Sequence, residues 1–212
     1  MRLPYKIIVL VVLLACFAAL AALVIRHGPA IAAFDANAAN WFSSIRSNGL
    51  DGVMLAVTKL GNPYETVGIF LVLGAFLSMK NRRSFYEFAI ASGCAIAAVG
   101  ALKILIDRPR PPMHLLFETG SSFPSAHATM ATVYLLSAII LIAPLVKNRP
   151  ARNFLVAVCA ILFPVIALSR IYLSVHFASD VLAGIILGMA SFLFATIAVR
   201  HHKETILSPR TG

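Results

Sequence analysis

Residues 7–25 read IIVLVVLLACFAALAALVI, a run of apolar side chains without a single Asp, Glu, Lys or Arg. A helix rises about 1.5 Å per residue, so about 20 such residues are enough to cross the hydrocarbon core of a membrane. Residues 128–146 and 181–199 form two further uncharged runs of the same length. These three runs predict an integral membrane protein.

Three shorter apolar runs become full spans if their helices extend a turn or two past the flanking charges. We therefore predict an all-α, six-helix transmembrane bundle that forms one domain over residues 1–212, with spans at about residues 7–25, 60–79, 85–106, 127–146, 153–173 and 178–199. The first run exceeds the apolar core of about 7–15 residues in a signal peptide, which favours a retained anchor. Between the first two spans, Asp35, Arg46 and Asp51 interrupt an otherwise apolar and aromatic segment, which predicts an interfacial helical segment.

The composition excludes several classes of protein. Hydrophobic residues make up 60% of the chain and charged residues only 12%, whereas about a quarter of the residues of a soluble domain are charged. This excludes a soluble enzyme and a disordered chain, and three cysteines within apolar stretches do not predict a disulfide framework. The net charge of +10 comes from basic residues that lie between the apolar runs. We infer that these residues set the orientation of the protein in the membrane, and we expect no nucleic-acid partner.

The distribution of the bases predicts the topology. Eleven of the eighteen Lys and Arg residues fall on the side of the two termini. Because cytoplasmic loops carry an excess of Lys and Arg, we predict that both termini are cytoplasmic and that the outer ends of spans three to six face the periplasm or exterior. The small size of the chain favours the cytoplasmic (inner) membrane of a bacterium.

Ionisable residues at membrane depth are functional candidates, and here they gather at those outer ends. They lie in residues 103–111 (KILIDRPRP), 122–127 (SFPSAH) and 169–180 (SRIYLSVHFASD). Convergence of these segments would bring together three cations, two imidazoles and one carboxylate, namely Lys103, Arg110, Arg170, His127, His176 and Asp180. Guanidinium groups bind tetrahedral oxyanions and a histidine can attack phosphorus, so the cluster predicts a phosphate site. Two histidines and a carboxylate could hold zinc or iron, but three cations would repel a divalent ion, so we expect no metal and no cofactor.

The spacings within the cluster carry structural predictions. His176 and Asp180 are four residues apart and would share one helix face if the last span begins near them. Lys103 and Arg110 are seven apart, two helical turns, although the prolines beside Arg110 should end the helix between them. The segment around Ser125 predicts the start of the fourth span, where its hydroxyl and the first backbone N–H groups would face the oxyanion.

Structural alternatives remain open for some of these residues. Asp107 could be the salt-bridge partner of Lys103, and Arg170 with Asp180 could be a buried pair that ties the last two spans together. We expect Arg108 and Asp107 to form a local or headgroup contact.

In this order, the three segments resemble the signature of the type 2 phosphatidic acid phosphatase (PAP2) superfamily, which includes bacterial membrane lipid phosphatases. Its first motif is Lys, six residues, then Arg-Pro, which selects Arg110 over Arg108. Its second motif is Pro-Ser-Gly-His, matched by residues 124–127 with Ala126 in place of the glycine. Its third motif is Ser-Arg, five residues, His, three residues, Asp, matched by residues 169–180.

The resemblance implies roles for these residues. His176 would be the nucleophile that forms a phosphohistidine, Asp180 would orient it, and His127 would serve as general acid and then base. The phosphate-binding residues would be Lys103, Arg110, Ser125, Ala126 and Arg170.

The resemblance also implies a metal-independent lipid phosphatase. Its substrate would be a phosphate monoester or pyrophosphate of a lipid, either a polyprenyl pyrophosphate such as undecaprenyl pyrophosphate, or phosphatidylglycerol phosphate or phosphatidate. The alternative is a non-enzymatic anion-binding or transport membrane protein, since intramembrane charges also mark ion paths. The confinement of the polar residues to one side and the lack of an inverted repeat weigh against a transporter.

Overall fold

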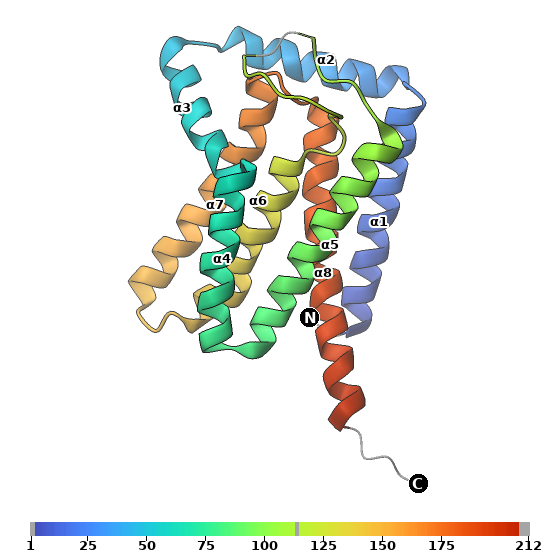
Figure 1. The fold of residues 1–212 in the computed structure, drawn as a ribbon. Helices are drawn as coiled ribbons and strands as arrows, with labels where there is room; N and C mark the ends of the chain where they lie inside the picture. The colour runs from blue at the N-terminus through green and yellow to red at the C-terminus, as the bar shows by residue number, and fades with distance from the viewer. Residues whose placement is uncertain (1–2, 113–114, 208–212) are drawn as a thin grey trace.

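The computed structural model describes residues 3–112 and 115–207, with side chains described as far as residue 200. Every regular element of these residues is a helix, which confirms the all-α fold (Figure 1). The elements are α1 (Leu3–Ile25), α2 (Pro29–Ser44), α3 (Asn48–Thr58), the short η1 (Lys59–Gly61), α4 (Pro63–Lys80), α5 (Arg82–Ile106), α6 (Ala126–Ser137) with its continuations η2 (Ala138–Ile142) and η3 (Ala143–Leu145), α7 (Arg149–Tyr172) and α8 (Ala178–Leu207).

Five helices in the described part of the chain are individually long and apolar enough to cross a membrane. They are α1, α5, α6 with its continuation to Leu145, α7, and α8 as far as Arg200. The predicted span at residues 60–79 corresponds to α4, which reaches this standard only together with α3 and η1, at an angle of 54° to them. The bend falls at Asn62, which is extended, with Pro63 at the first position of α4. Proline keeps its preceding residue out of the helical region, so the Asn-Pro pair explains the break.

The predicted helix at residues 127–146 is only partly α-helical. Its regular part ends at Ser137 and is followed by one π-helical and one 3₁₀ turn. Pro144 lies in the last turn and has no N–H to donate, so the α-helical hydrogen-bond ladder cannot continue through it. In contrast, α8 extends beyond the predicted end at residue 199.

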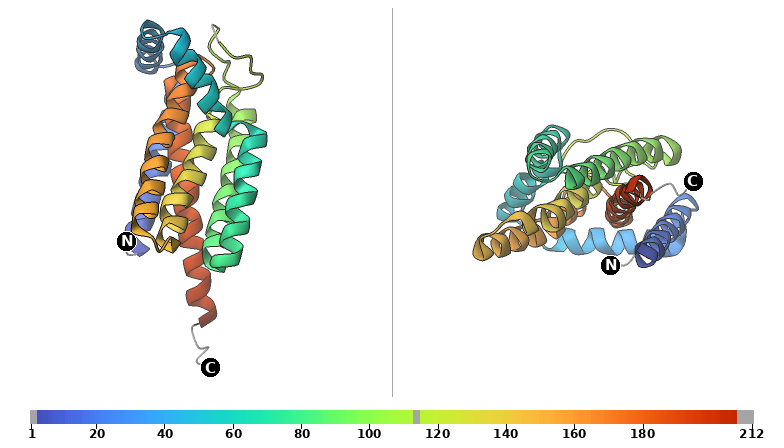
Figure 2. Two further views of the ribbon diagram at one scale, coloured as in Figure 1. Left: turned by 90° about the vertical axis from the view of Figure 1, so that its left-hand side faces the viewer. Right: turned by 90° about the horizontal axis from the view of Figure 1, so that it is seen from below.

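Helix α8 packs against α1, α5 and α6, and the view along the bundle shows it among its neighbours (Figure 2). Two glycines set its distance from α6. A Cβ atom on Gly184 would lie 2.6 Å from the carbonyl oxygen of Ser125, and one on Gly188 would lie 2.6 Å from Cβ of Thr132. Small residues allow this close helix approach in a membrane protein. As a result the starts of α6 and α8 adjoin, and the Ser125 N–H donates to the carbonyl of Asp180 at 3.0 Å.

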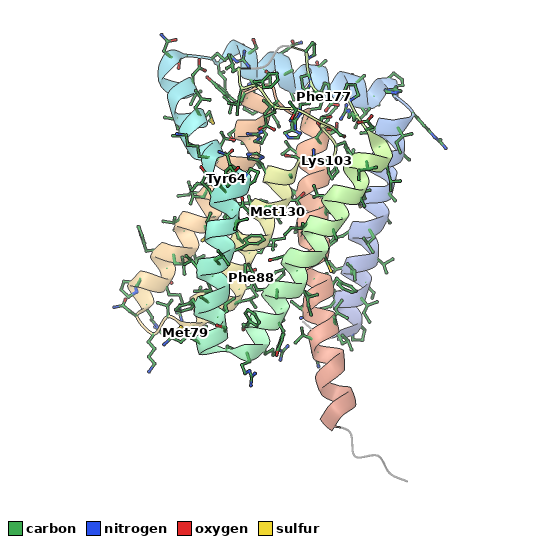
Figure 3. The ribbon with its side chains drawn as sticks, in the orientation of Figure 1. Tyr64, Met79, Phe88, Lys103, Met130 and Phe177 are labelled. Atoms are coloured by element: carbon green, nitrogen blue, oxygen red, sulfur yellow. The ribbon has the colours of Figure 1, made fainter. Side chains whose placement is uncertain are left out.

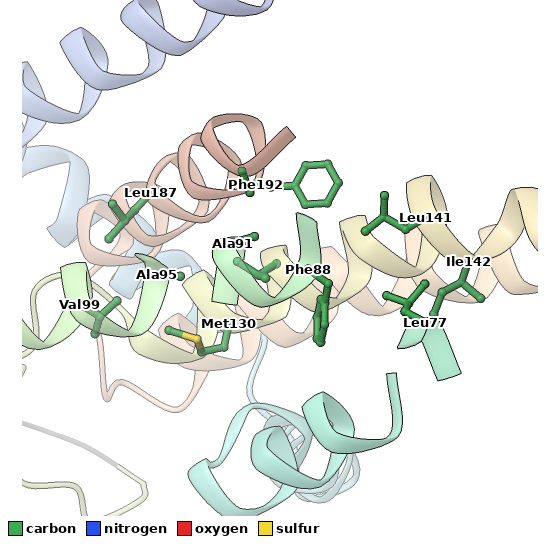
Figure 4. Packing of buried hydrophobic residues seen from close by; sticks show 12 residues of the cluster. Leu77, Phe88, Ala91, Ala95, Val99, Met130, Leu141, Ile142, Leu187 and Phe192 are labelled. Carbon is green, nitrogen blue, oxygen red and sulfur yellow. The ribbon is translucent and has the colours of Figure 1, made fainter. Parts of the chain in front are cut away.

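Apolar packing holds the part of the bundle remote from these helix starts. Figure 4 shows buried side chains of α4, α5, α6, η2 and α8 meeting in one cluster, among them Leu77, Phe88 and Leu187. The rings of Phe70 and Phe88 make an edge contact at 5.3 Å. Burial of such groups stabilises the bundle without any polar partner, so the polar groups are free to gather elsewhere.

Helix α2 crosses one end of the bundle, and α3 leads from it back toward α4 (Figure 1). Its side chains Asp35 and Phe42 are buried, while Trp41 is exposed. The ring of Phe42 makes an edge contact with Tyr172 at the end of α7. The predicted segment between the first two spans is therefore two helices that cover the bundle end, and their location at a membrane interface stays a prediction.

Candidate active site

A cavity of about 830 Å³ lies between α4, α5 and α6 and the loop that follows α5. It is at the end of the bundle covered by α2, where Figure 3 labels Lys103 and Phe177, and far from Met79 at the other end. Five residues of the predicted site line it, from all three sequence motifs: Lys103, Arg110, Ala126, His127 and His176. The structure therefore brings the three segments together around one hollow.

His176 lies in the short connection between α7 and α8, and its side chain is almost completely buried. Its Nε2 atom is 3.3 Å from Nη1 of Arg110, and its Nδ1 atom is 3.5 Å from Oδ2 of Asp180. Burial lowers the pKa of His176 to about 4, although the Asp180 carboxylate acts in the opposite direction. At neutral pH the imidazole is uncharged, and because arginine only donates, Nε2 is the nitrogen that accepts and carries the lone pair.

Asp180 is fully buried in the first turn of α8. Its Oδ2 atom accepts a hydrogen bond from the N–H of Phe177 at 2.9 Å and faces His176. The expectation that His176 and Asp180 share a helix face was wrong, because α8 begins only at Ala178. The two side chains meet because the chain turns at the helix start. Their 3.5 Å separation is long for an N–H···O bond.

His127 lies in the first turn of α6 and also lines the cavity. Its Nε2 atom is 3.0 Å from Oδ1 of Asn62, at the break between η1 and α4. An amide oxygen only accepts, so Nε2 carries the proton in this contact. Gly61 makes room for the ring, since a Cβ atom there would lie 2.5 Å from Cδ2 of His127. No motif marks Asn62 or Gly61, and sequence reasoning missed both.

Glu118, in the loop between α5 and α6, joins two of the predicted phosphate ligands. Its carboxylate pairs with Arg170 through one oxygen and, at 3.1 Å, with Arg110 through the other. Burial would raise the pKa of Glu118, but the attraction of Arg170 and Arg110 outweighs burial and holds this pKa below its ordinary value. An anion thus sits between the two guanidinium groups, which is the property expected of an oxyanion site. Sequence reasoning missed Glu118, whose only signal was an acid between the first two motifs.

The other predicted ligands differ in their access to the cavity. Arg170 is fully buried and also donates to Oγ1 of Thr58 at 2.5 Å. The ammonium group of Lys103, in the last turn of α5, donates to the carbonyl of Ser121. Ser125 is the buried N-cap of α6, and its hydroxyl accepts from the N–H of Ala128. Lys103 lines the cavity, whereas Arg170 and Ser125 stand behind its wall.

One spacing prediction is confirmed: helix α5 ends at Ile106, between Lys103 and Arg110, and Arg110 returns to the site on the loop. The structure overturns the other interpretations of these segments. Among the described contacts, Lys103 forms no salt bridge with Asp107 and donates to the carbonyl of Ser121. Arg170 and Asp180 do not pair with each other, since Arg170 pairs with Glu118 and Asp180 with Arg108. Arg108 makes no local contact with its neighbour, because its guanidinium turns inward to bind two buried carboxylates.

The model of the PAP2 superfamily matches residues 84–204, more than half of the chain. The chain belongs to this superfamily. Phosphatidylglycerophosphatase B of Bacillus subtilis (strain 168) is 30% identical over 153 residues, which are 70% of this chain and 74% of that protein. Decaprenylphosphoryl-5-phosphoribose phosphatase of Mycobacterium tuberculosis is 34% identical over 125 residues, 57% of this chain and 64% of that protein.

Two solved structures have a similar fold. The crystal structure of a transmembrane PAP2 type phosphatidylglycerolphosphate phosphatase from Bacillus subtilis matches with a TM-score of 0.77 and 28% identity, over 95% of this chain and 98% of that one. The crystal structure of Aquifex aeolicus LpxE, with a TM-score of 0.59, 23% identity and coverage of 74% and 91%, is similar in fold. These matches confirm the predicted family and the enzyme class, a membrane phosphatase, over the non-enzymatic alternative.

No three His, Cys, Asp or Glu side chains within the described ranges are grouped so that they could hold a metal ion. The cations Lys103 and Arg110 line the cavity, and both phosphate binding by them and metal independence stay predictions.

Proposed function

We propose that this PAP2 phosphatase hydrolyses a lipid phosphate monoester or pyrophosphate through a phosphohistidine on His176. The observation that carries the proposal is the state of that side chain, a buried, neutral imidazole whose Nε2 atom faces Arg110 at the cavity and whose other nitrogen faces Asp180. A nucleophile needs a free lone pair, and a carboxylate behind the ring stabilises the positive charge that the attack creates.

The proposed reaction has two chemical steps. In the first step Nε2 of His176 forms a bond to phosphorus, the bond from phosphorus to the leaving oxygen breaks, and His127 gives that oxygen a proton. In the second step water attacks phosphorus, the N–P bond breaks, and His127 takes the proton of the water. Inorganic phosphate leaves and both histidines return to their initial states.

The cations supply the charge stabilisation that metal ions provide in other phosphoryl-transfer sites. Arg110 and Arg170 would bind two phosphate oxygens in the positions that the Glu118 carboxylate occupies, and Lys103 would bind a third. Ala126, at the first N–H groups of α6, would complete the oxyanion site.

The lipid chain would lie along α4 and α5. Apolar side chains of both helices line the cavity, including Val67, Phe70, Ile96 and Val99. Val67 and Ile96 are more than half exposed on the outer surface of the bundle, so the cavity reaches the surface that would face lipid. A chain entering sideways there would place its phosphate beneath α2, and either an acyl or a prenyl chain fits an apolar groove.

The orientation in the bacterial inner membrane is part of the proposal. The site lies at one end of the bundle, and the start of α1 and the end of α8 lie at the other (Figure 1). With cytoplasmic termini, as the distribution of bases favours, the site faces the periplasm or exterior.

Single-turnover labelling tests the proposal. Purified enzyme mixed with a ³²P-labelled lipid phosphate should acquire acid-labile label on His176, and the yield should be unchanged by a chelator of divalent ions and abolished by vanadate, an oxyanion analogue of the transferring group. Comparison of undecaprenyl pyrophosphate, phosphatidylglycerol phosphate and phosphatidate then ranks the substrates. Label on another residue would overturn the assigned nucleophile, and chelator-sensitive labelling would overturn the role of the cations.

A further inference from the structure

Arg108 is a cation at the site that does not line the cavity. Its guanidinium bridges two buried carboxylates on different helices, Asp180 of α8 at 2.5 Å and Asp35 of α2 at 2.8 Å. It also stacks over the ring of Phe177, with 4.1 Å from Cζ to the ring centroid. A rigid planar fork with this stacking fixes both carboxylates in place, which a flexible lysine could not do.

Asp35 forms further hydrogen bonds at the start of α8. One of its oxygens accepts from the N–H of Ser179 at 2.8 Å, and the other accepts from the Ser179 hydroxyl at 2.7 Å and from Arg108. Asp35 therefore connects α2 to the residue directly before Asp180. It lies well before residues 84–204, the part of the chain that matches the family model.

The charges of this cluster do not cancel. Asp35 and Asp180 carry two negative charges and Arg108 one positive charge, so the cluster holds a net charge of −1 in a buried setting. Without Asp35, Arg108 would neutralise Asp180, and the carboxylate would do less to stabilise a positive imidazole. With Asp35 present, one negative charge remains for His176, the only histidine that Asp180 faces among the described contacts.

We infer that Asp35 and Arg108 are positioning residues for the reaction. Arg108 holds one oxygen of Asp180 so that the other faces Nδ1 of His176, and Asp35 keeps the negative charge of Asp180 available to the imidazole. The inference rests on the proposed role of His176 as nucleophile. It makes α2, the helix that covers the bundle end, part of the catalytic apparatus although it does not touch the substrate phosphate.

The test measures the rate of acid-labile labelling in single-turnover reactions at saturating lipid phosphate. Asp35→Asn keeps the shape of the side chain and removes its charge. It should slow labelling by roughly 10–100-fold, the range typical of residues that orient a functional group through another. Its KM should stay close to the wild-type value because Asp35 and Arg108 lie outside the phosphate cavity.

A second substitution separates this role from simple structural support. Asp35→Asn combined with Arg108→Gln restores the net charge of −1, so the double variant should label faster than Asp35→Asn alone by at least about twofold. A residue that only supports the fold gives no reason for a recovery, and a double variant as slow as or slower than Asp35→Asn would overturn the inference. The matched control is Glu87→Gln, which removes another buried carboxylate paired with an arginine, Arg83, far from the site, and should label at the wild-type rate.

Two further outcomes keep the test decisive. If Asp35→Asn does not fold, Arg108→Lys replaces it, since lysine keeps the charge but loses the fork. That variant should also label slowly at an unchanged KM, and a wild-type rate would overturn the inference. If the wild type itself acquires no label on His176, the proposed function fails. If the wild type is labelled and Asp35→Asn matches it, only the present inference fails.

Discussion

The two walls of the cavity are stabilised by different interactions. The wall that carries His176 is backed by buried charges behind the cavity lining, with Arg108, Asp180 and Arg170 each fixed by ionic partners. The wall formed by α4 and α5 is mostly apolar apart from Lys103, and Gly100 leaves open space beside its helix. Ionic contacts have strict geometry, whereas apolar contacts tolerate variation in the group they bind. One wall is therefore suited to chemistry on an invariant phosphate, and the other to lipid chains of variable structure.

The largest effect should come from the nucleophile on the ionic wall. His176→Ala leaves no group that can form the covalent intermediate, so it should be inactive on every substrate and acquire no acid-labile phosphate. Single-turnover labelling with a lipid phosphate, a pyrophosphate and nitrophenyl phosphate measures this. Residual labelling with any of them would place the nucleophile elsewhere.

The effect of losing His127 should depend on the leaving group. General acid catalysis typically contributes about 10²–10⁴-fold, and it is needed most when the leaving oxygen is a strong base. His127→Ala should therefore be most defective with a lipid phosphate, less with a pyrophosphate and least with nitrophenyl phosphate, whose anion departs without a proton. Equal defects in phosphoenzyme formation with all three compounds would remove the acid role from His127.

Gly61→Ala tests how strongly kcat depends on the position of the His127 ring. The added Cβ atom would lie 2.5 Å from the imidazole, so the ring must shift. Because a misplacement of about 1 Å can cost about 10²-fold, kcat for a lipid phosphate should fall by up to that factor while the labelled site stays His176. Gly68→Ala in α4, where the new Cβ atom meets nothing within 4 Å, is the matched control and should retain wild-type kcat. Wild-type activity of Gly61→Ala would show that this ring position is not critical.

A substitution on the apolar wall should affect lipid substrates alone. Gly100 lines the cavity, and a Cβ atom there meets nothing within 4 Å, so a leucine side chain should extend into the space of the lipid chain. If about two methylene groups of the lipid chain lose their contact, at about 0.8 kcal/mol each, KM for a lipid phosphate should rise about tenfold. KM for nitrophenyl phosphate should not change. Gly93→Leu is the control, since Gly93 is equally open but does not line the cavity. An equal rise in KM for both substrates would contradict a groove that binds only the chain.

The smallest effect should be that of mild acid. The nucleophile acts as the neutral imidazole, and burial lowers the pKa of His176 to about 4. Its contribution to kcat/KM should therefore persist above this value and decline as the pH falls through about 4, instead of through about 6.5 as for an ordinary histidine. The profile is measured with nitrophenyl phosphate and corrected for the ionisation of the substrate, determined by ³¹P NMR. A decline that remains centred near 6.5 after correction would mean that burial does not lower this pKa.

Apolar run length and motif spacing were enough to predict the helical membrane fold and the family. The hydrophobicity of a segment depends only on its own residues. The runs at residues 7–25 and 181–199 therefore identify helices without reference to their neighbours. The only sequence signal of the break at Asn62 was the proline that follows it. Whether a helix bends or ends at a proline depends on what the helix packs against.

The sequence by itself also indicated that its three charged segments meet at one site, since charges are tolerated in a membrane bundle only where they meet partners or water. Only the tertiary structure decided which partners they meet. Glu118 reaches Arg170, and Arg108 links Asp35 to Asp180, across separations of tens of residues. Ionic pairing depends on distance and direction in space, and the covering position of α2 and the close contact of α6 with α8 are set by packing. Local sequence records the charge of each residue but not the geometry that pairs it.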